Sequence, residues 1–168
     1  MDLLIKEADV CLTNTKGITR VEQTDIGISN GKIKEIGQIA SHRARQVFSA
    51  KNLTILPGII DTQVHFRQPG MTHKEDIESG SASALLGGIT AFFEMPNTSP
   101  PTTTRQAFEE KIEIAQSKSW THFAFYVGAA HDNLSELPEL EKLPGCPGVK
   151  LFMGSSTGSL LIEDDHSL

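Results

Sequence analysis

The chain has 168 residues, of which 38% are hydrophobic and 21% charged, as in an ordinary soluble protein. Its net charge of −6 argues against a general nucleic-acid binder, because no basic stripe is present to neutralise phosphates, although one or two arginines suffice for a small anionic substrate. The two cysteines have neither Cys-x-x-Cys spacing nor a disulfide pattern, which favours a reducing, cytoplasmic setting. The first residues lack a signal-peptide pattern, and no apolar run is long enough to predict a membrane span.

Residues 1–52 predict a small β meander. Asn30-Gly31 predicts a hairpin within it, because both residues tolerate a positive φ. Turn residues separate the short apolar or alternating runs that we expect to be strands. These runs are Leu3–Ile5, Val10–Leu12, Ile26–Ile28 and Ile33–Ile36.

After residue 53 the sequence predicts strands that alternate with helices. This order is typical of an α/β fold with parallel strands and right-handed crossovers, and it amounts to about half of an eight-stranded barrel. The expected strands are 53–60, 89–94, 120–127 and 148–153, and the expected helices are 73–86, 105–118 and a short pair in 134–143 broken at Pro138.

Local signals mark the helix ends. Thr72 with Glu75 three residues later forms a capping box before the first helix, and Gly87-Gly88 ends that helix. Thr104 is the expected N-cap of the second helix, in which Phe108 and other apolar residues fall on one face.

Polar residues alternate with apolar ones where the first of these strands ends. On an extended chain every second side chain points to one face, so a strand that holds to residue 67 brings the polar groups together. Four polar groups at the end of an apolar strand are typical of a site at the C-terminal mouth of a parallel sheet or barrel. The four residues are Asp61, Gln63, His65 and Arg67.

The later strands also end in polar residues, which we expect to meet at the same mouth. Glu94 ends the second strand and Asn97 follows it, His131 follows the third, and Lys150 lies in the fourth. Asn97 is a candidate donor to a substrate or the centre of an Asx turn. Lys150, in an apolar strand, is costly to bury unless paired or modified, or else its ammonium reaches the solvent.

His65 and Arg67 each allow two interpretations. His65 is a candidate metal ligand through a neutral imidazole nitrogen, or a structural histidine. The planar guanidinium of Arg67 suits a carboxylate of a substrate, or it forms an ion pair with Glu75 or Glu78.

Several blocks together resemble the dihydroorotases of the amidohydrolase superfamily. They match in order and spacing over about residues 55–102 and again at 148–152. The blocks are Pro57-Gly58-Ile59-Ile60-Asp61-x-x-Val64-His65-Phe66-Arg67-x-Pro69-Gly70, Lys74-Glu75-Asp76-Ile77-Glu78-Ser79-Gly80, Gly87-Gly88-Ile89-Thr90, Met95-Pro96-Asn97-Thr98-x-Pro100-Pro101 and Gly148-Val149-Lys150-Leu151-Phe152.

The resemblance implies a fold and a reaction. The fold is the N-terminal portion of a (β/α)8 TIM-type barrel, about four βα units over residues 53–168, preceded by a small β-sandwich segment over residues 1–52. The reaction is the interconversion of N-carbamoyl-aspartate and dihydroorotate in pyrimidine biosynthesis, at a centre of one or two zinc ions. The implied partners are the small-molecule substrate and either further copies of the chain or another pyrimidine enzyme.

The resemblance also assigns roles to residues. His65 matches a metal ligand, and Lys150 matches a position where the family often has a carboxylated lysine that bridges two metals. Arg67 and Asn97 match the groups that hold the substrate carboxylate, and Arg67 separates dihydroorotases from hydantoinases and allantoinases. Gln63 occupies a position where the family has histidine, and its amide oxygen is a poorer zinc ligand.

Two departures from the family leave other hypotheses open. Gln63 also fits an inactive homologue that serves as a scaffold or regulatory partner, and a related hydantoinase or allantoinase is a third reading. The family's remaining histidines and catalytic aspartate lie on strands after Leu168, so we expect the chain alone to lack the full active site. His131 and His166 match no family motif and are not expected to replace them.

Overall fold

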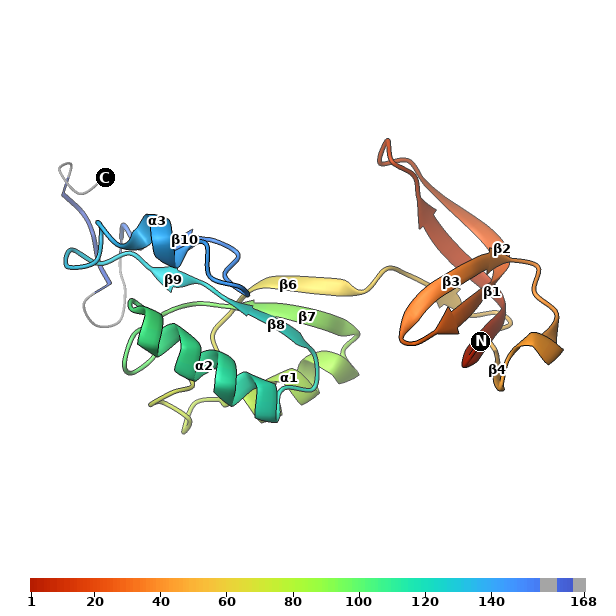
Figure 1. Cartoon of the computed structure of the whole chain (residues 1–168), viewed down its shortest axis with the longest axis horizontal. Helices are drawn as coiled ribbons and strands as arrows, with labels where there is room; N and C mark the ends of the chain where they lie inside the picture. The colour runs from red at the N-terminus through yellow and green to blue at the C-terminus, as the bar shows by residue number, and fades with distance from the viewer. Residues whose placement is uncertain (155–159, 165–168) are drawn as a thin grey trace. The chain divides into compact units, whose positions relative to one another are not determined.

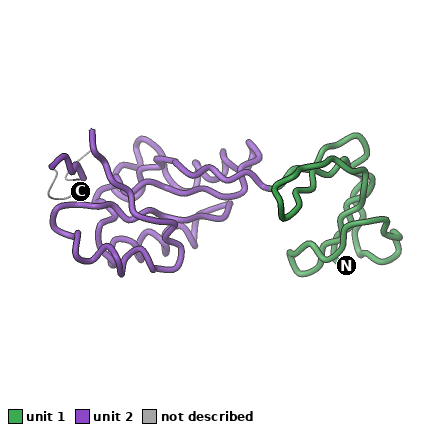
Figure 2. The backbone as a smooth tube through the Cα atoms, turned by 90° about the horizontal axis from the view of Figure 1, so that it is seen from above, with its two compact units in different colours: residues 1–57 green, residues 58–168 purple. Residues whose placement is uncertain are grey.

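The computed structural model describes residues 1–154 and 160–164, and the chain divides into two compact units, residues 1–57 and 58–168 (Figure 2). Residues 54–55 pair with the first strand of the chain, which is why the first unit extends to Pro57. Among the described residues, no helix has the length and apolar character needed to cross a membrane.

The first unit is a five-stranded sheet. Its strand order is β3-β2-β1-β4, and β5 also pairs with β1 (Figure 1). The predicted hairpin at Asn30-Gly31 is confirmed, since these residues join β2 to β3 with φ of 52° and 70°. The elements are β1 (Leu3–Thr13), β2 (Thr19–Ser29), β3 (Lys32–Gly37), the 3-10 turn η1 (Ser41–Arg43), β4 (Gln46–Ser49) and β5 (Thr54–Ile55).

A bulge joins two strands that the sequence predicts separately. Residues 3–5 and 10–12 belong to one strand, β1, whose pairing with β2 shifts around Glu7, a residue with φ of 60°. Asp25 of β2 holds this bulge: its Oδ1 accepts the Glu7 amide at 2.9 Å, and its Oδ2 accepts the Ile39 amide at 2.9 Å and lies 3.2 Å from Lys6 Nζ. Burial raises the pKa of Asp25, but these amides and the ammonium outweigh it, so the pKa lies below its ordinary value.

The second unit is mixed α/β, and the predicted alternation of helices with parallel strands is confirmed. Strands β6, β7 and β8 form one parallel sheet in that order, and β9 pairs in parallel with β10. Helices α1 and α2 lie on the same side of the β6-β7-β8 sheet (Figure 1). The elements are β6 (Ile59–Val64), α1 (Ile77–Leu86), β7 (Ile89–Glu94), α2 (Arg105–Lys118), β8 (His122–Phe125), β9 (Val127–Gly128), α3 (Leu137–Leu140) and β10 (Val149–Lys150).

Aromatic residues build the core between these helices and the sheet. Phe92 of β7 is fully buried, with its ring centroid 4.8 Å from that of Phe66 and 6.3 Å from that of Phe125, both in edge-on geometry. Phe108 and Ala115, spaced two turns apart on α2, close the core from the helix side. The predicted apolar face of the second helix is therefore confirmed.

The predicted helix ends are correct where neighbouring residues in the sequence determine them. Thr104 caps α2 as predicted, with its Oγ1 accepting the Ala107 amide at 3.2 Å, and Gly87-Gly88 ends α1 as predicted. The predicted start of α1 near Thr72 is wrong: residues 71–74 form a turn, and the helix begins at Ile77.

The true start of α1 has two side-chain caps. Asp76 Oδ1 accepts the Ser79 amide at 2.8 Å, and the buried Gln68 Oε1 accepts the Ile77 amide at 3.0 Å. Gln68 reaches the helix from the loop after β6, which a local capping pattern does not reveal. The predicted helix pair around Pro138 is also corrected, because Pro138 lies in the first turn of a single short helix, α3.

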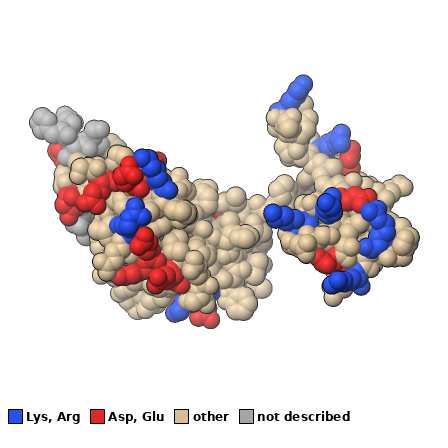
Figure 3. Space-filling model, viewed as in Figure 1, with Lys and Arg blue, Asp and Glu red and all other residues tan. Residues whose placement is uncertain are grey.

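The outer face of α2 is acidic. Glu109, Glu110 and Glu113 are exposed, and Asp and Glu side chains gather on this side of the unit in Figure 3. The face offers no complement to phosphates, in keeping with the negative net charge.

Candidate functional site

The polar residues Asp61, Gln63, His65 and Arg67, within and just after β6, do not share one strand face as predicted. Strand β6 ends at Val64, and its register with β7 shifts between Asp61 and Val64. This irregularity puts Asp61 in a pocket beside α1 that Val64 and Phe66 also line, while the Gln63 amide donates to Asp61 Oδ1 at 3.0 Å. Arg67 has φ of 69°, which is outside the extended region, so the alternation of side chains along a strand does not apply to it either.

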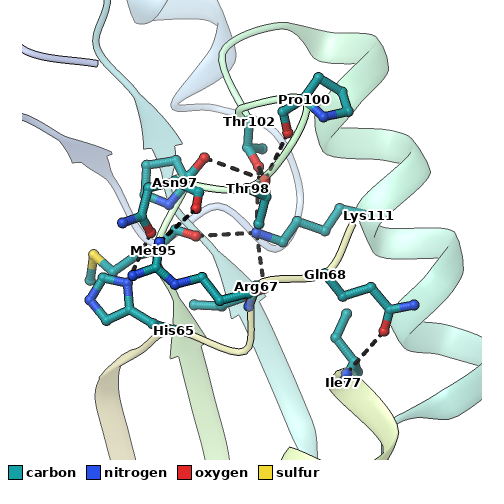
Figure 4. Close-up of polar contacts among 12 residues, drawn as sticks. His65, Arg67, Gln68, Ile77, Met95, Asn97, Thr98, Pro100, Thr102 and Lys111 are labelled. Carbon is teal, nitrogen blue, oxygen red and sulfur yellow. Dashed lines mark hydrogen bonds and ion pairs between the residues drawn. The ribbon is translucent and has the colours of Figure 1, made fainter. Parts of the chain in front are cut away.

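His65 and Asn97 nevertheless come together, from the ends of neighbouring parallel strands. His65 Nδ1 lies 2.9 Å from Asn97 Oδ1 (Figure 4). A carbonyl oxygen carries no proton, so in this pairing Nδ1 donates, and in a neutral imidazole Nε2 then holds the lone pair. Asn97 is buried and His65 is exposed, so a fixed amide orients an exposed imidazole ring.

Arg67 completes the cluster. Its Nη1 donates to the main-chain oxygen of Asn97 at 3.1 Å, and its amide donates to Glu94 Oε1 at 3.0 Å. One residue in the left-handed region therefore ties the loop after β6 to the end of β7 through both its side chain and its backbone. Such a conformation is unfavourable for a residue with a side chain and persists where its surroundings fix it.

The loops that carry these residues are in direct contact. The Ser99 amide donates to Pro69 O at 3.1 Å, and Gly70 has φ of 87° with no room for a Cβ atom against Ser99. The loop after β7 is also tied to β9, because the Gly128 amide donates to Thr102 O at 2.8 Å. These hydrogen bonds therefore hold together the two loops that carry His65, Arg67 and Asn97.

The other sequence candidates lie outside this set of bonds. Neither Gln63 nor Lys150 is hydrogen-bonded to His65, Arg67 or Asn97 in the described part of the chain. The half-buried Lys150 places its Nζ 5.0 Å from the centroid of the Phe152 ring. His131 Nδ1 lies 3.6 Å from Asp164 Oδ2 at the surface, and His166 is outside the described residues.

Sequence reasoning missed a buried ion pair under the cluster. Lys111 Nζ of α2 lies 2.9 Å from Glu94 Oε2 of β7, and both side chains are fully buried. Burial raises the pKa of Glu94 and lowers that of Lys111, while each charge opposes the shift of the other. The signal was present: Lys111 falls between Phe108 and Ala115 on the apolar face of the helix, where a lone lysine needs a partner.

The described residues do not make a complete metal site by themselves. Residues 1–154 and 160–164 contain no group of three or more His, Cys, Asp and Glu side chains arranged to hold a metal ion. His65, oriented by Asn97 through Nδ1, is chemically suited to be one ligand through Nε2 of the neutral imidazole. A metal ion bound by His65 would need further ligands.

The chain matches the sequence model of a known family. The model described as "Amidohydrolase family" matches residues 54–142. These residues include β6, β7 and the cluster of His65, Arg67 and Asn97.

Individual relatives point to the same superfamily. A dihydroorotase of Methanosarcina mazei is 38% identical over 98% of this chain, and an allantoinase of Deinococcus radiodurans is 36% identical over 93%. These matches cover 35% and 34% of the two relatives, so the chain spans about a third of their length. The solved structure of an L-hydantoinase (dihydropyrimidinase) from Arthrobacter aurescens matches with a TM-score of 0.85 and 31% identity, over 96% of this chain and 35% of that one.

The match to the family model and the structural match agree with the parallel β6-β7-β8 sheet. The resemblance noted from the sequence motifs is confirmed at the level of the family. This chain belongs to the amidohydrolase family.

Proposed function

We propose that this chain is the N-terminal portion of a dihydroorotase-type hydrolase that interconverts N-carbamoyl-aspartate and dihydroorotate in pyrimidine biosynthesis. The observation that carries the proposal is the hydrogen-bonded cluster of His65, Arg67 and Asn97 at the ends of β6 and β7. It supports a site for a carboxylate-bearing substrate, because a guanidinium held beside an amide suits that group. The 38% identity to a dihydroorotase adds to this support.

In this proposal the second unit is the first half of a (β/α)8 barrel, and the first unit is one part of a small β-sandwich. The parallel order β6-β7-β8 supports the first statement. Ile59 and Ile60 of the outer strand β6 are about half exposed, as expected of a strand that further barrel strands would cover. The first unit supplies a single sheet, which a second sheet would complete.

The residues of this chain have separate roles. Arg67 and Asn97 bind the carboxylate of the substrate and orient its ring, while Asn97 also fixes the ring of His65. His65 and Lys150, the latter carboxylated, are the ligands that this chain contributes to a centre of one or two zinc ions. Bound zinc supplies a Lewis acid that polarises the amide carbonyl and activates water.

The test is zinc content together with turnover of dihydroorotate, measured on the protein with all its barrel strands. The proposal expects one or two zinc ions per chain and hydrolysis of dihydroorotate to N-carbamoyl-aspartate. A His65→Ala variant should lose zinc, whereas a His42→Ala variant in the first unit should keep it. A protein that binds no zinc and does not turn over dihydroorotate overturns the proposal.

Gln63 supports a second candidate, an inactive homologue that acts as a scaffold or regulatory partner of another pyrimidine enzyme. A glutamine at this position lacks the imidazole nitrogen that zinc prefers. Substitution Gln63→His distinguishes the two proposals: gained zinc and activity indicate that the glutamine alone limits an otherwise competent site. Unchanged zinc content and absent turnover favour the scaffold.

The allantoinase and hydantoinase matches support a third candidate, a hydrolase of related cyclic amides. Hydantoin and allantoin carry no carboxylate for Arg67 to bind. Under this candidate, Arg67→Ala leaves their turnover nearly intact, and dihydroorotate is a poor substrate of the unmodified protein.

A further inference from the structure

The buried pair of Glu94 and Lys111 is in contact with both loops of the site. Lys111 Nζ donates to Met95 O at 3.2 Å and to Thr102 Oγ1 at 3.4 Å, both in the loop that carries Asn97 (Figure 4). Glu94 Oε1 accepts the amide of Arg67 at 3.0 Å, in the loop after β6. The two charges therefore connect the segments on which Asn97 and Arg67 are mounted.

Burying both charges of this pair costs free energy of desolvation. Both side chains have 0% exposure, and Lys111 Nζ also lies 4.9 Å from the centroid of the Phe125 ring in the core. Replacing a buried ion pair by apolar residues of similar volume is often neutral or stabilising. The retained charges are thus better explained by the geometry they impose than by the stability they add.

That geometry is specific at Arg67. Its φ of 69° turns its amide toward Glu94 while its Nη1 bonds Asn97 O. If the acceptor is lost, the half-buried amide loses this hydrogen bond and the turn relaxes toward a more common conformation. The guanidinium would then move away from Asn97.

We propose that Glu94 and Lys111 are positioning residues that fix the spacing of Arg67 and Asn97 and so set the affinity for a carboxylate-bearing substrate. The choice of substrate class rests on the proposed function; the positioning itself does not. The pair acts through the backbone and touches no reacting atom.

Two double variants isolate this role, because they share one apolar replacement and differ only in the acceptor offered to Arg67. In Glu94→Met with Lys111→Met, the amide of Arg67 has no acceptor. In Glu94→Gln with Lys111→Met, the side-chain oxygen at position 94 can still accept it. Neither variant leaves a buried charge, so both are expected to fold.

The expected result is a difference in KM. With dihydroorotate as substrate, the Met-Met variant has a KM at least about 10-fold higher than the Gln-Met variant, as the loss of the hydrogen bond at the Arg67 amide implies, with kcat changed by less than about 3-fold. Turnover of hydantoin differs little between the two variants. Equal KM values for dihydroorotate in two folded variants overturn the proposal.

A second readout keeps the positioning testable apart from the reaction. Amide hydrogen exchange at Arg67, followed by NMR, should be at least about 10-fold faster in the Met-Met variant than in the Gln-Met variant, while exchange at Phe108 is the same in both. A protein that does not turn over dihydroorotate overturns the proposed function, but faster exchange at Arg67 then still supports the positioning pair. Equal exchange at Arg67 overturns the pair.

Discussion

Removal of the buried ammonium alone is the perturbation with the largest expected effect on stability. In Lys111→Met, a side chain of similar length replaces the lysine, and the carboxylate of Glu94 loses its counter-charge. Oε2 of Glu94 has no other donor among the described residues, whereas Oε1 keeps the amide of Arg67. In this variant the buried carboxylate of Glu94 therefore keeps a donor at Oε1 and has none at Oε2 among the described residues.

The magnitude follows from the two ways in which the protein can respond. Breaking a buried pair from one side costs about 3–5 kcal/mol. Glu94 can instead take up a proton, and for a carboxyl with an ordinary pKa of 4.5 this costs about 3.4 kcal/mol at pH 7. Protonation thus limits the loss, and we expect a decrease of about 3 kcal/mol in the free energy of unfolding at pH 7.

The loss should depend on pH with a definite sign. Without Lys111 the burial of Glu94 raises its pKa further in the folded protein, so the folded state binds the proton more tightly than the unfolded state does. The variant is then relatively most stable below pH 4.5 and loses stability as pH rises through the raised pKa. The difference from the unmodified protein therefore shrinks as pH falls from 7 toward 5.

Urea unfolding at pH 7 and pH 5, followed by circular dichroism, measures both quantities. Lys142→Met is the matched control, because Lys142 forms a 2.7 Å ion pair with Glu139 that is largely exposed. The control should change stability little at either pH, since solvent screens such pairs. Equal losses for the two lysine variants, or a loss in Lys111→Met that does not depend on pH, refute the reasoning.

Three further predictions concern the helices and the first unit. Gly80→Ala should lower the free energy of unfolding by about 1–3 kcal/mol, because the added Cβ would lie 2.6 Å from the Phe66 ring. Ser83→Ala, on the exposed face of α1, should not lower it, and thermal or urea unfolding compares the two. Equal stability of the two variants contradicts this packing. Thr104→Ala should cost about 1 kcal/mol by loss of the α2 cap, and an unchanged urea midpoint argues against the cap. Asp25→Asn should lower stability at pH 7, and the difference should vanish as pH falls through the lowered pKa of Asp25; acid titrations of both proteins check this, and a gap that persists at low pH disproves it.

The sequence is a good guide wherever neighbouring residues decide the structure. The bounds of β7, the Thr104 cap and the Gly87-Gly88 stop depend on local chemistry, and all three are as predicted. The start of α1 is not, because Gln68 caps it from another loop. An acceptor nine residues away leaves no mark on a capping pattern.

In the candidate site, too, the sequence predicts some features correctly and not others. The motifs indicate that His65, Arg67 and Asn97 belong together, and hydrogen bonds join them. Alternation along one strand nevertheless does not explain this grouping, since β6 ends at Val64 and Arg67 adopts a positive φ. That conformation depends on Glu94, a residue of the neighbouring strand, which periodicity along one strand does not report.

The most direct measurement of the central claim is the substrate preference of Arg67→Lys in the protein with all its barrel strands. Lysine keeps the positive charge but lacks the planar fork that pairs with a carboxylate. The account predicts that kcat/KM for dihydroorotate falls by at least about 10-fold, which corresponds to about 1.4 kcal/mol, while kcat/KM for hydantoin changes by less than about 3-fold. Equal changes for the two substrates, or an unchanged value for dihydroorotate, would contradict a carboxylate site at Arg67 and Asn97.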